Sequence, residues 1–253
     1  MRKLYTEERR NTILHQIVEE SRASVAQLAK MLNVSEVTIR SDLKELERQG
    51  QIRRTHGGAI IREDNDVSFS NRLTQRREEK ARIAACAAEY IHEHDSIMLD
   101  ASSTCLELAK QIRKLDRAVT VVTNGLYAAQ ELSGQNHINV FIIGGMIRNQ
   151  NTVEGLVGTS IFDFIHPTKF FFSARALASN GSLMDFDLQE VELKRHMFRR
   201  AAQRICVLDA SKFGTYSVSE FGNLSDVQTL VTDEGVSDEV RKDFPETDFV
   251  IAP

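Results

Sequence analysis

Residues 24–58 constrain the fold of this chain more than any other stretch, because they predict two short capped helices followed by a basic hairpin. Ser24 stands three residues before Gln27, the spacing at which a side chain and a backbone cap a helix start reciprocally. Asn33 suits a left-handed helix end, and Ser35 suits the cap of a second helix. Two capped helices joined by a short turn indicate a helix-turn-helix, whose second helix lies in the major groove of DNA.

Apolar residues recur at helical spacing in both helices and predict their buried sides. In the first helix these are Val25, Leu28, Ala29 and Leu32. In the second helix we expect four apolar side chains to point inward, namely Val37, Ile39, Leu43 and Leu46. The solvent face of the second helix carries side chains that can bond base edges or phosphates, namely Ser35, Glu36, Thr38, Arg40, Ser41 and Lys44.

A basic hairpin is predicted directly after the second helix. Residues 51–54 and 59–61 are short apolar and basic stretches, and Gly57-Gly58 between them supplies the positive φ of a hairpin turn. Three basic residues are expected on this wing, beside the phosphate backbone: Arg53, Arg54 and His56. Many small domains contain a capped helix pair and never touch DNA, so the basic wing is the feature that favours DNA binding.

The order of residues across this stretch forms a long pattern. It reads Val34-Ser35-x-x-Thr38-Ile39-Arg40-x-Asp42-Leu43, then Leu46, Gly50 and Arg54-x-His56-Gly57-Gly58-Ala59. This pattern resembles the N-terminal signature of the DeoR family, bacterial regulators of sugar catabolism. Ser41 departs from it, because the family usually carries a second arginine at that position.

The distribution of charge also separates the start of the chain from the rest. Residues 1–62 carry 12 Lys and Arg against 8 Asp and Glu, whereas the remainder of the 253-residue chain has a net charge of −8. A basic module on an acidic body is the electrostatic footprint of a DNA-reading domain attached to something else. We expect a DNA-binding domain over residues 1–61, a polar linker over 62–77 and an effector domain over 78–253, which the family resemblance makes a sugar-phosphate-sensing and oligomerisation domain.

Neither a metal site nor a membrane segment is expected. Cys86, Cys105 and Cys206 are widely spaced, and the chain contains no Cys-x-x-Cys pair or Cys/His cluster. No stretch approaches the roughly 18 consecutive apolar residues of a membrane span. The N-terminus lacks the apolar run of a signal peptide. We therefore expect a cytoplasmic protein without a cofactor, a metal or membrane contact.

Regular patterns lie on both sides of the DNA-binding stretch. Residues 6–20 predict a first helix that packs on the helix-turn-helix and leaves Arg9 and Arg10 exposed. Beyond residue 78, helix-like segments alternate with apolar strand-like runs at residues 96–99, 119–123, 139–143, 170–173, 205–208, 227–231 and 249–251. Such alternation indicates an α/β domain with a mainly parallel sheet covered on both faces.

The residues that follow these strands are the candidates for a ligand site, because ligands bind at the carboxyl ends of parallel strands. The first loop presents hydroxyls and amides at a helix start, which suits a phosphate: Asp100, Ser102, Ser103 and Thr104. Later loops add Thr123, Asn124, Gly144, Gly145, Arg148 and Lys212. Any one of these loops is ordinary in an α/β domain. Together they favour a phosphorylated, hydroxyl-rich small molecule over a nucleotide, since no Walker or G-x-G-x-x-G motif occurs.

The same loops lie in segments that resemble the effector domain of the DeoR family. These are Leu99-Asp100-x-Ser102-Ser103-Thr104, Val122-Thr123-Asn124, Gly144-Gly145-x-x-Arg148, Glu190-x-x-x-Lys194 and Asp209-x-Ser211-Lys212-Phe213-Gly214. The resemblance implies a fold similar to ribose-5-phosphate isomerase and adds Glu190 and Lys194 to the effector site. It also implies a homo-oligomeric repressor, dimer or tetramer, that a phosphorylated sugar releases from double-stranded operator DNA.

Arg175 stands about where the family usually carries an acid after its fourth strand. Isomerases of this fold use a carboxylate near that position for proton transfer, and a permanently charged arginine cannot act as a base. We therefore favour an effector-binding Arg175 and a repressor with no catalytic residue. The alternative is an isomerase-like enzyme carrying a DNA module, with Asp185, Asp187 and Glu190 as its candidate carboxylates.

The identity of the effector is suggested by two short runs. Residues 100–105 (Asp-Ala-Ser-Ser-Thr-Cys) and the Phe-Ser pair after the fourth strand resemble the fucose-operon regulators of the family. That resemblance implies a deoxy-ketose 1-phosphate, such as fuculose 1-phosphate or rhamnulose 1-phosphate.

Overall fold

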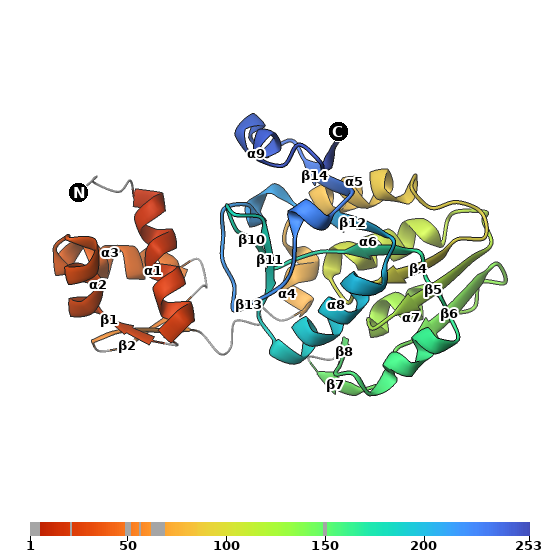
Figure 1. Ribbon diagram of the computed structural model, residues 1–253, viewed down its shortest axis with the longest axis horizontal. Helices are drawn as coiled ribbons and strands as arrows, with labels where there is room; N and C mark the ends of the chain where they lie inside the picture. Colours follow the sequence, from red (N-terminus) through yellow and green to blue (C-terminus); the bar gives the residue numbers. More distant parts are fainter. Residues whose placement is uncertain (1–5, 21, 49–51, 56, 62–68, 149–150) are drawn as a thin grey trace.

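The computed structural model describes residues 6–20, 22–48, 52–55, 57–61, 69–148 and 151–253. Within these residues the chain forms an N-terminal winged helix-turn-helix and a larger C-terminal α/β domain (Figure 1). The predicted fold class is therefore confirmed. No helix in the described ranges combines the length and the apolar character that a membrane crossing requires.

Three helices and a small antiparallel sheet make up the described part of the N-terminal domain. In chain order the elements are α1 (Thr6–Glu20), β1 (Arg22–Ser24), α2 (Val25–Leu32), α3 (Glu36–Arg48), β2 (Ile52–Thr55) and β3 (Gly58–Ile61). β3 lies between β1 and β2. A Cβ atom on Gly58 would lie 2.1 Å from the carbonyl oxygen of Ala23, so only glycine allows β3 to lie this close to β1.

The predicted caps of the helix-turn-helix are confirmed. Ser24 and Gln27 form the reciprocal capping box at the start of α2. Asn33 ends that helix in the left-handed conformation, with φ 52°. The hydroxyl of Ser35 accepts a hydrogen bond from the amide of Thr38 at 3.1 Å and so caps α3. Local side-chain chemistry therefore sets both helix boundaries.

Two expectations about exposure in this domain are wrong. Val37 is 76% exposed, because it lies two residues, about 200° around a helix, from the buried Ile39 and so faces solvent. Arg9 and Arg10 do not lie free on α1. Their Nε atoms are 2.6 Å and 3.1 Å from the carboxylate of Asp42, which is 2% exposed. This pair of contacts ties α1 to α3.

A seven-stranded, entirely parallel sheet forms the centre of the C-terminal domain. From edge to edge its strands are β15 (Asp248–Ala252), β14 (Thr229–Asp233), β12 (Gln203–Val207), β9 (Lys169–Phe172), β4 (Ser96–Leu99), β5 (Val119–Thr123) and β6 (Ile138–Ile142). Each bound lies within two residues of the predicted one. Apolar runs locate these strands well because both faces of the sheet are buried.

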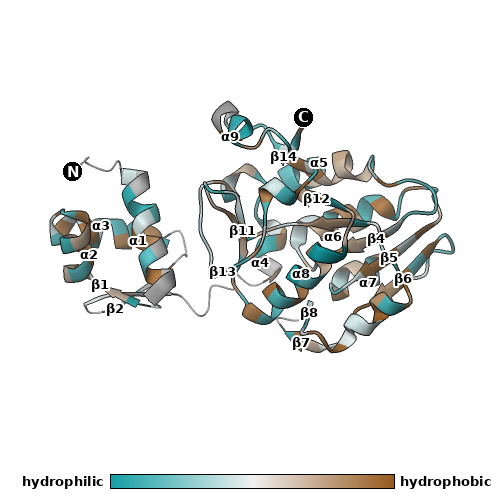
Figure 2. Cartoon of the chain, in the orientation of Figure 1, coloured by the Kyte–Doolittle hydropathy of each residue, from teal (hydrophilic) through white to brown (hydrophobic). Residues whose placement is uncertain are grey.

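Helices cover both faces of this sheet. One face packs against α5 (Arg77–Ala88), α6 (Ser103–Ile112) and α7 (Leu126–Leu132), and the other packs against α8 (Leu188–Arg200). Consecutive residues of β4 and β9 alternate between the two cores, as Leu99 and Phe171 face α6 while Met98 and Phe172 face α8. In Figure 2 the hydrophobic colour accordingly follows the strands of the sheet between the helices.

Several short elements were not predicted. A hairpin of β7 (Met146–Arg148) and β8 (Thr152–Glu154) follows β6, and β10 (Ala176–Leu177), β11 (Ser182–Asp185) and β13 (Ser219–Asn223) form a second antiparallel sheet. Strands of two to five residues are too short to show a clear period. Residues after β8 form a 3₁₀ helix, η1 (Val157–Asp163). The remaining elements are η2 (Ala210–Lys212), η3 (Leu224–Asp226) and α9 (Asp238–Asp243).

The range expected to be a linker contains a helix, α4 (Phe69–Thr74). Phe69 is 4% exposed within the core of the C-terminal domain, and its ring stacks on that of Tyr127 with centroids 5.3 Å apart. The last part of the range therefore packs on the effector domain. The domain boundaries themselves stay a prediction.

Candidate functional site

A cavity of about 230 Å³ lies at the carboxyl ends of three central strands. Its walls include residues 102–104 after β4, residues 173–175 after β9 and residues 209–212 after β12. Seven of the residues predicted from the sequence line it: Ser102, Ser103, Thr104, Arg175, Glu190, Lys194 and Lys212. This is the location expected for a ligand in a parallel α/β sheet.

The ammonium group of Lys194 lies at the floor of the cavity and is 4% exposed. It is 2.5 Å from Asp185, 3.1 Å from Asp100 and 3.9 Å from Glu190, and it donates a hydrogen bond to the carbonyl of Ser173. Burial acts to lower the pKa of Lys194, but these carboxylates outweigh burial and raise it. The lysine is therefore charged, and it holds together the loops that follow β4 and β9.

Asp100 does not line the cavity but lies beneath it, almost completely buried. Its carboxylate accepts hydrogen bonds from the amides of Ser102 and Ser173 at 2.9 Å and 2.8 Å. Burial would raise the pKa of this carboxyl, but Lys194 and the hydrogen bonds more than offset burial and lower it. Asp100 is thus an ionised support for the first loop.

Glu190 is the acid of this group that titrates near neutrality. Burial raises its pKa to about 7, with Lys194 opposing the rise and Asp185 adding to it. Three carboxylates share one ammonium here, so a proton on Glu190 reduces the excess of negative charge. The acid wall of the cavity can therefore present both a carboxylate and a carboxylic acid to ligand hydroxyls.

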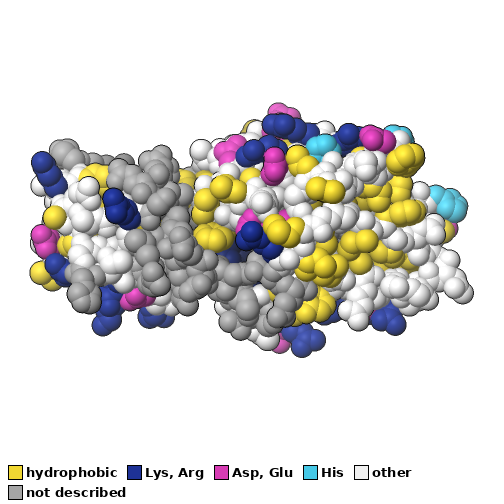
Figure 3. All heavy atoms as spheres, turned by 90° about the horizontal axis from the view of Figure 1, so that it is seen from below, with side chains coloured by type: hydrophobic (Ala, Val, Ile, Leu, Met, Phe, Trp, Pro, Cys, Tyr) yellow, Lys and Arg dark blue, Asp and Glu magenta, His cyan; other side chains and the backbone are white. Residues whose placement is uncertain are grey.

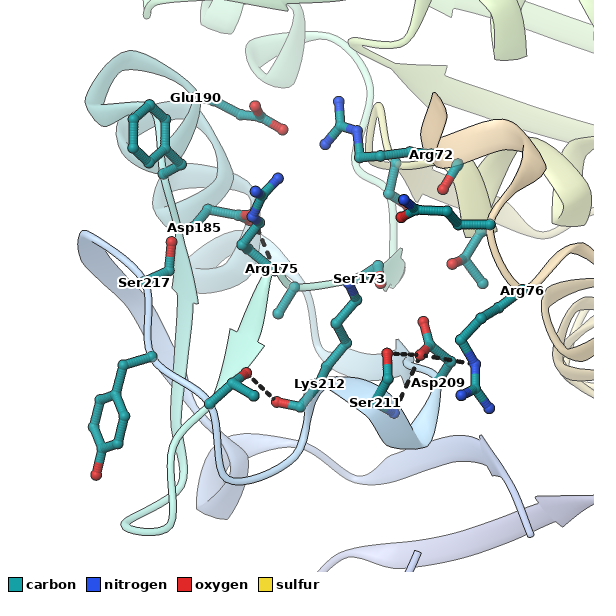
Figure 4. Close-up of a pocket in the computed structure, with 18 of the residues that line it drawn as sticks. Arg72, Arg76, Ser173, Arg175, Asp185, Glu190, Asp209, Ser211, Lys212 and Ser217 are labelled. Atoms are coloured by element: carbon teal, nitrogen blue, oxygen red, sulfur yellow. Dashed lines mark hydrogen bonds and ion pairs between the residues drawn. The ribbon is translucent and has the colours of Figure 1, made fainter. Parts of the chain in front are cut away.

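The opposite wall is cationic. Arg72 of α4, Arg76 and Lys212 line it, whereas Arg175 lies beside Asp185, whose carboxylate accepts a hydrogen bond from the Arg175 backbone amide at 3.1 Å. In Figure 4 the side chains of Arg72 and Glu190 point toward one another from α4 and α8, and Lys212 extends from η2 toward Ser173. Burial lowers the pKa of Lys212. A cavity with guanidinium groups on one side and carboxyl groups on the other suits a ligand with an anionic end and a polyhydroxylated end.

Arg76 and Lys80 shape the cationic wall as well as charging it. Arg76 adopts the left-handed conformation, with φ 50°, and its guanidinium lies 3.3 Å from Asp209 and 3.1 Å from Asp233. Lys80 donates hydrogen bonds to the carbonyls of Arg72 and Gln75, and burial lowers its pKa to about 8. Together they fix the turn between α4 and α5.

Five predicted effector residues lie outside the cavity lining: Thr123, Asn124, Gly144, Gly145 and Arg148. The side chain of Asn124 donates to the carbonyl of Val153 at 3.1 Å, and Arg148 pairs with Glu154 at 3.4 Å. Both contacts hold the β7–β8 hairpin, which covers the carboxyl ends of β5 and β6. The structure therefore does not bring these five residues to the cavity: Thr123 and Asn124 lie at the end of β5 against the hairpin, and Gly144, Gly145 and Arg148 lead into it or belong to it.

Several residues that line the cavity are not among those predicted from the sequence, for example Arg72, Arg76 and Ser173. A signal for the two arginines existed, because residues 72–77 contain three arginines directly before a helix. Residues 72–77 nevertheless fall within the polar range predicted to be a linker. Only the packing of α4 on the core brings it to the sheet.

The predicted DNA-contacting side chains of α3 lie on its solvent face. Ser35, Glu36, Arg40, Ser41 and Lys44 are exposed, and Thr38 is half-buried. Arg40 pairs with Glu36 at 3.2 Å. The exposed Val37 lies on the same face, and its apolar side chain suits contact with the methyl group of a thymine. On the wing, Arg54 bonds Glu47 at 2.7 Å, the side chain of Arg53 is not described, and His56 lies outside the described residues.

The cavity also contacts the DNA-binding domain. Leu14 of α1 lines it, and the side chain of Asn11 donates a hydrogen bond to the carbonyl of Gly214 at 3.0 Å. Tyr216 lines the cavity and packs against the apolar core of the N-terminal domain. The loop over residues 213–218 thus joins η2, which carries Lys212, to α1.

Two family models match this chain, one in each domain. The DeoR-like helix-turn-helix domain matches residues 9–65, and the DeoR C terminal sensor domain matches residues 75–234. The chain belongs to the DeoR family. The resemblance inferred from the sequence motifs is thereby confirmed.

Members of the DeoR family with curated names are similar to this chain over nearly their full length. The HTH-type transcriptional regulator GolR of Listeria innocua is 36% identical over 240 residues, which is 94% of each chain. The glycerol-3-phosphate regulon repressor of Escherichia coli is 30% identical over 230 residues, 89% of this chain and 90% of its own length. These relatives are named as regulators, as expected for a DNA-binding protein rather than an enzyme.

A solved structure of ribose 5-phosphate isomerase A from Neisseria gonorrhoeae is also similar to this chain. The match covers 56% of each chain at 14% identity, with a TM-score of 0.41. So distant a similarity carries no conclusion about ligand or activity.

Proposed function

We propose that this DeoR-family regulator represses a carbohydrate operon and leaves its operator when a phosphorylated sugar enters the cavity. The observation that carries this proposal is the location of Lys212. Its side chain points into the cavity, and its loop continues directly into the segment that contacts α1. One ligand can therefore act on both domains.

The phosphate group is assigned to the cationic wall. Ser102 caps α6 by accepting a hydrogen bond from the amide of Cys105, which leaves the amides of residues 103 and 104 at the helix start, where the helix dipole also favours an anion. Lys212 and Arg76 add cationic groups from the other side, with Arg76 held in ion pairs with Asp209 and Asp233. Arg76 holds a strained left-handed conformation that arginine does not favour, and such strain concentrates at ligand sites.

The sugar hydroxyls are assigned to the acid wall. Glu190 and Asp185 line the cavity, and carboxyl groups accept hydrogen bonds from hydroxyls. Lys194 already occupies part of their bonding capacity, which fixes the direction in which the remaining oxygens face. A deoxy-ketose 1-phosphate, such as fuculose 1-phosphate or rhamnulose 1-phosphate, remains our first candidate.

Release from DNA is assigned to the loop over residues 213–218. A phosphate drawn to Lys212 would pull on η2 and on the loop attached to it. Asn11 and Tyr216 connect that loop to α1, whose Arg9 and Arg10 hold α3 through Asp42. A small shift at Lys212 thereby reaches the helix that reads DNA. By linkage, operator DNA must weaken effector binding by the same factor.

The test is fluorescence anisotropy of the protein on DNA from upstream of its own gene, titrated with a panel of sugar phosphates that includes glycerol 3-phosphate. We expect one compound to release the wild type and to have no effect on Lys212→Ala, which keeps its affinity for DNA. Lys110→Ala is the matched control, because Lys110 is a partly exposed lysine of α6 that pairs with Glu107 and does not line the cavity.

Two outcomes would contradict the proposal. If no phosphorylated sugar disturbs the complex, the sensor function fails and the DNA-binding function stands. If Lys212→Ala responds at an unchanged concentration, the effector binds elsewhere.

A further inference from the structure

We infer that Val37 is a specificity-determining residue for DNA and contacts the methyl group of a thymine in the major groove. Val37 is the second residue of α3, the recognition helix of the winged helix-turn-helix. The first residues of a recognition helix are the ones that contact base edges. The inference rests on the DNA-binding part of the proposed function and is independent of the effector.

The exposure of Val37 is not explained by the protein alone. Its side chain is 76% exposed, whereas the buried side of α3 is formed by Ile39, Leu43 and Leu46. A β-branched valine also has a lower helix propensity than alanine, leucine or the charged residues that usually cover an exposed helix face. Neither packing nor helix propensity therefore accounts for a valine at this position.

The polar side chains around Val37 are held by one another. The hydroxyl of Ser35 accepts a hydrogen bond from the amide of Thr38 at 3.1 Å and lies 2.9 Å from the hydroxyl of Thr38. The guanidinium of Arg40 pairs with the carboxylate of Glu36 at 3.2 Å. Val37 itself can form only apolar contacts. A base that faces Val37 must therefore supply an apolar group.

Val37 begins a stripe of exposed side chains along α3. Residues three, four and seven positions further on share its side of the helix, and these are Arg40, Ser41 and Lys44, all exposed. The side chain of Ser41 is short, so it leaves the two methyl groups of Val37 uncovered. The stripe thus combines one apolar contact with groups that suit hydrogen bonds to bases or phosphates.

Thymine is the standard base that presents a methyl group in the major groove. The major-groove edges of guanine and adenine present hydrogen-bond acceptors and donors, and cytosine presents an amino group. If Val37 lay against one of those polar groups, it would remove water from the group without replacing the hydrogen bond. Val37 therefore favours thymine at the base position that it faces.

The test is a uracil scan of duplex DNA that the wild type selects from a random library, measured by fluorescence anisotropy without effector. Uracil in place of thymine removes the methyl group and keeps every hydrogen-bonding group of the base. At one thymine of each recognised half-site, we expect uracil to weaken binding by roughly threefold to tenfold. Val37→Ala, which lacks both γ-methyl groups, should bind the thymine and uracil duplexes with nearly equal affinity. Val37→Ile should keep the preference for thymine.

Met31→Ala is the matched control. Met31 is a large apolar residue of α2 that is 39% exposed, in the same domain but outside the recognition helix. This variant should show the same loss on uracil DNA as the wild type. Circular dichroism should be unchanged in all three variants, because each altered side chain is exposed.

Two results would overturn the inference. One is a scan in which uracil weakens binding of the wild type at no position of the selected DNA. The other is a Val37→Ala variant with the full wild-type loss at the sensitive thymine, because another residue would then read the methyl group. Both results are obtained on DNA that the protein binds and without effector, so they leave DNA binding and the sensor proposal standing.

Discussion

The cavity and an exposed apolar face on the C-terminal domain are built in the same way and have opposite chemistry. Both arise from loops that follow parallel strands of one sheet, the cavity after β4, β9 and β12 and the face after β5 and β6. The cavity gathers charged groups around Lys194, whereas the face gathers seven exposed apolar side chains: Phe141, Ile142, Met146, Ile147, Leu156, Val157 and Phe164. In the view from below, hydrophobic side chains gather on the C-terminal domain, on the side where β6, β7 and β8 lie in Figure 1 (Figure 3). The carboxyl end of a strand therefore locates a loop, and only tertiary packing decides whether that loop lines a ligand cavity or an exposed apolar surface.

The largest expected effect is on the cavity side. Lys194→Met should lower the free energy of unfolding by about 3–5 kcal/mol, because it leaves Asp100 and Asp185 buried without their cation. Urea unfolding measures the change. Arg113→Met, which removes a more exposed pair with Glu131, should cost about 1 kcal/mol or less. Equal losses in the two variants would show that the buried cluster does not organise this region.

The free energy of unfolding should also depend on pH through Glu190 in the cavity. The pKa of Glu190 is raised to about 7 in the folded chain, so the folded state binds more protons than the unfolded state between that value and the ordinary one. Glu190 therefore stabilises the folded state at low pH, and this contribution is lost as the pH rises through about 7. The contribution to the free energy of unfolding is no more than about 3 kcal/mol.

Urea unfolding of the wild type and of Glu190→Gln at pH 5 and pH 8 tests this dependence. The free energy of unfolding of the variant, relative to that of the wild type, should be higher at pH 8 than at pH 5, because the variant has no carboxyl group to ionise at this position. A constant difference between the two proteins at both pH values would contradict the raised pKa.

The loop that leads into β7, beside the face, can be tested with two adjacent glycines. Gly145→Ala should lower the free energy of unfolding by about 1–3 kcal/mol, since its new Cβ meets the backbone of Glu154. Gly144→Ala should change it by less than about 0.5 kcal/mol, because a Cβ there meets nothing within 4 Å. Both variants should bind effector normally. If Gly144→Ala alone abolished effector binding, the motif would belong to the ligand site after all.

The parts of the fold that follow from local interactions could be predicted from the sequence. The caps at Ser24, Asn33 and Ser35 involve residues a few positions apart, and the strands of the central sheet are apolar on both faces. Their signals do not depend on the rest of the molecule. Seven of the residues that line the cavity were found because they follow these strands directly or belong to a family motif.

The remaining features depend on contacts between distant residues. Arg72 and Arg76 reach the cavity only because Phe69 anchors α4 on the core. Arg9 and Arg10 are held by Asp42, more than 30 positions away. The loops at Thr123 and Gly144 carry the residue types of a ligand site, but they pack against or lead into the unpredicted β7–β8 hairpin and do not line the cavity. None of these contacts has a local pattern.

The claim that the effector binds in the cavity and not at the face is tested most directly by calorimetric titration of the effector found in the anisotropy panel. The titration would be run on the wild type, on Lys212→Ala and on the Val157→Asp, Phe164→Asp double variant. We predict that Lys212→Ala loses effector binding, and that the double variant binds effector with wild-type affinity. Loss of effector binding in the double variant would contradict the account, because the cavity and the face would then form a single site.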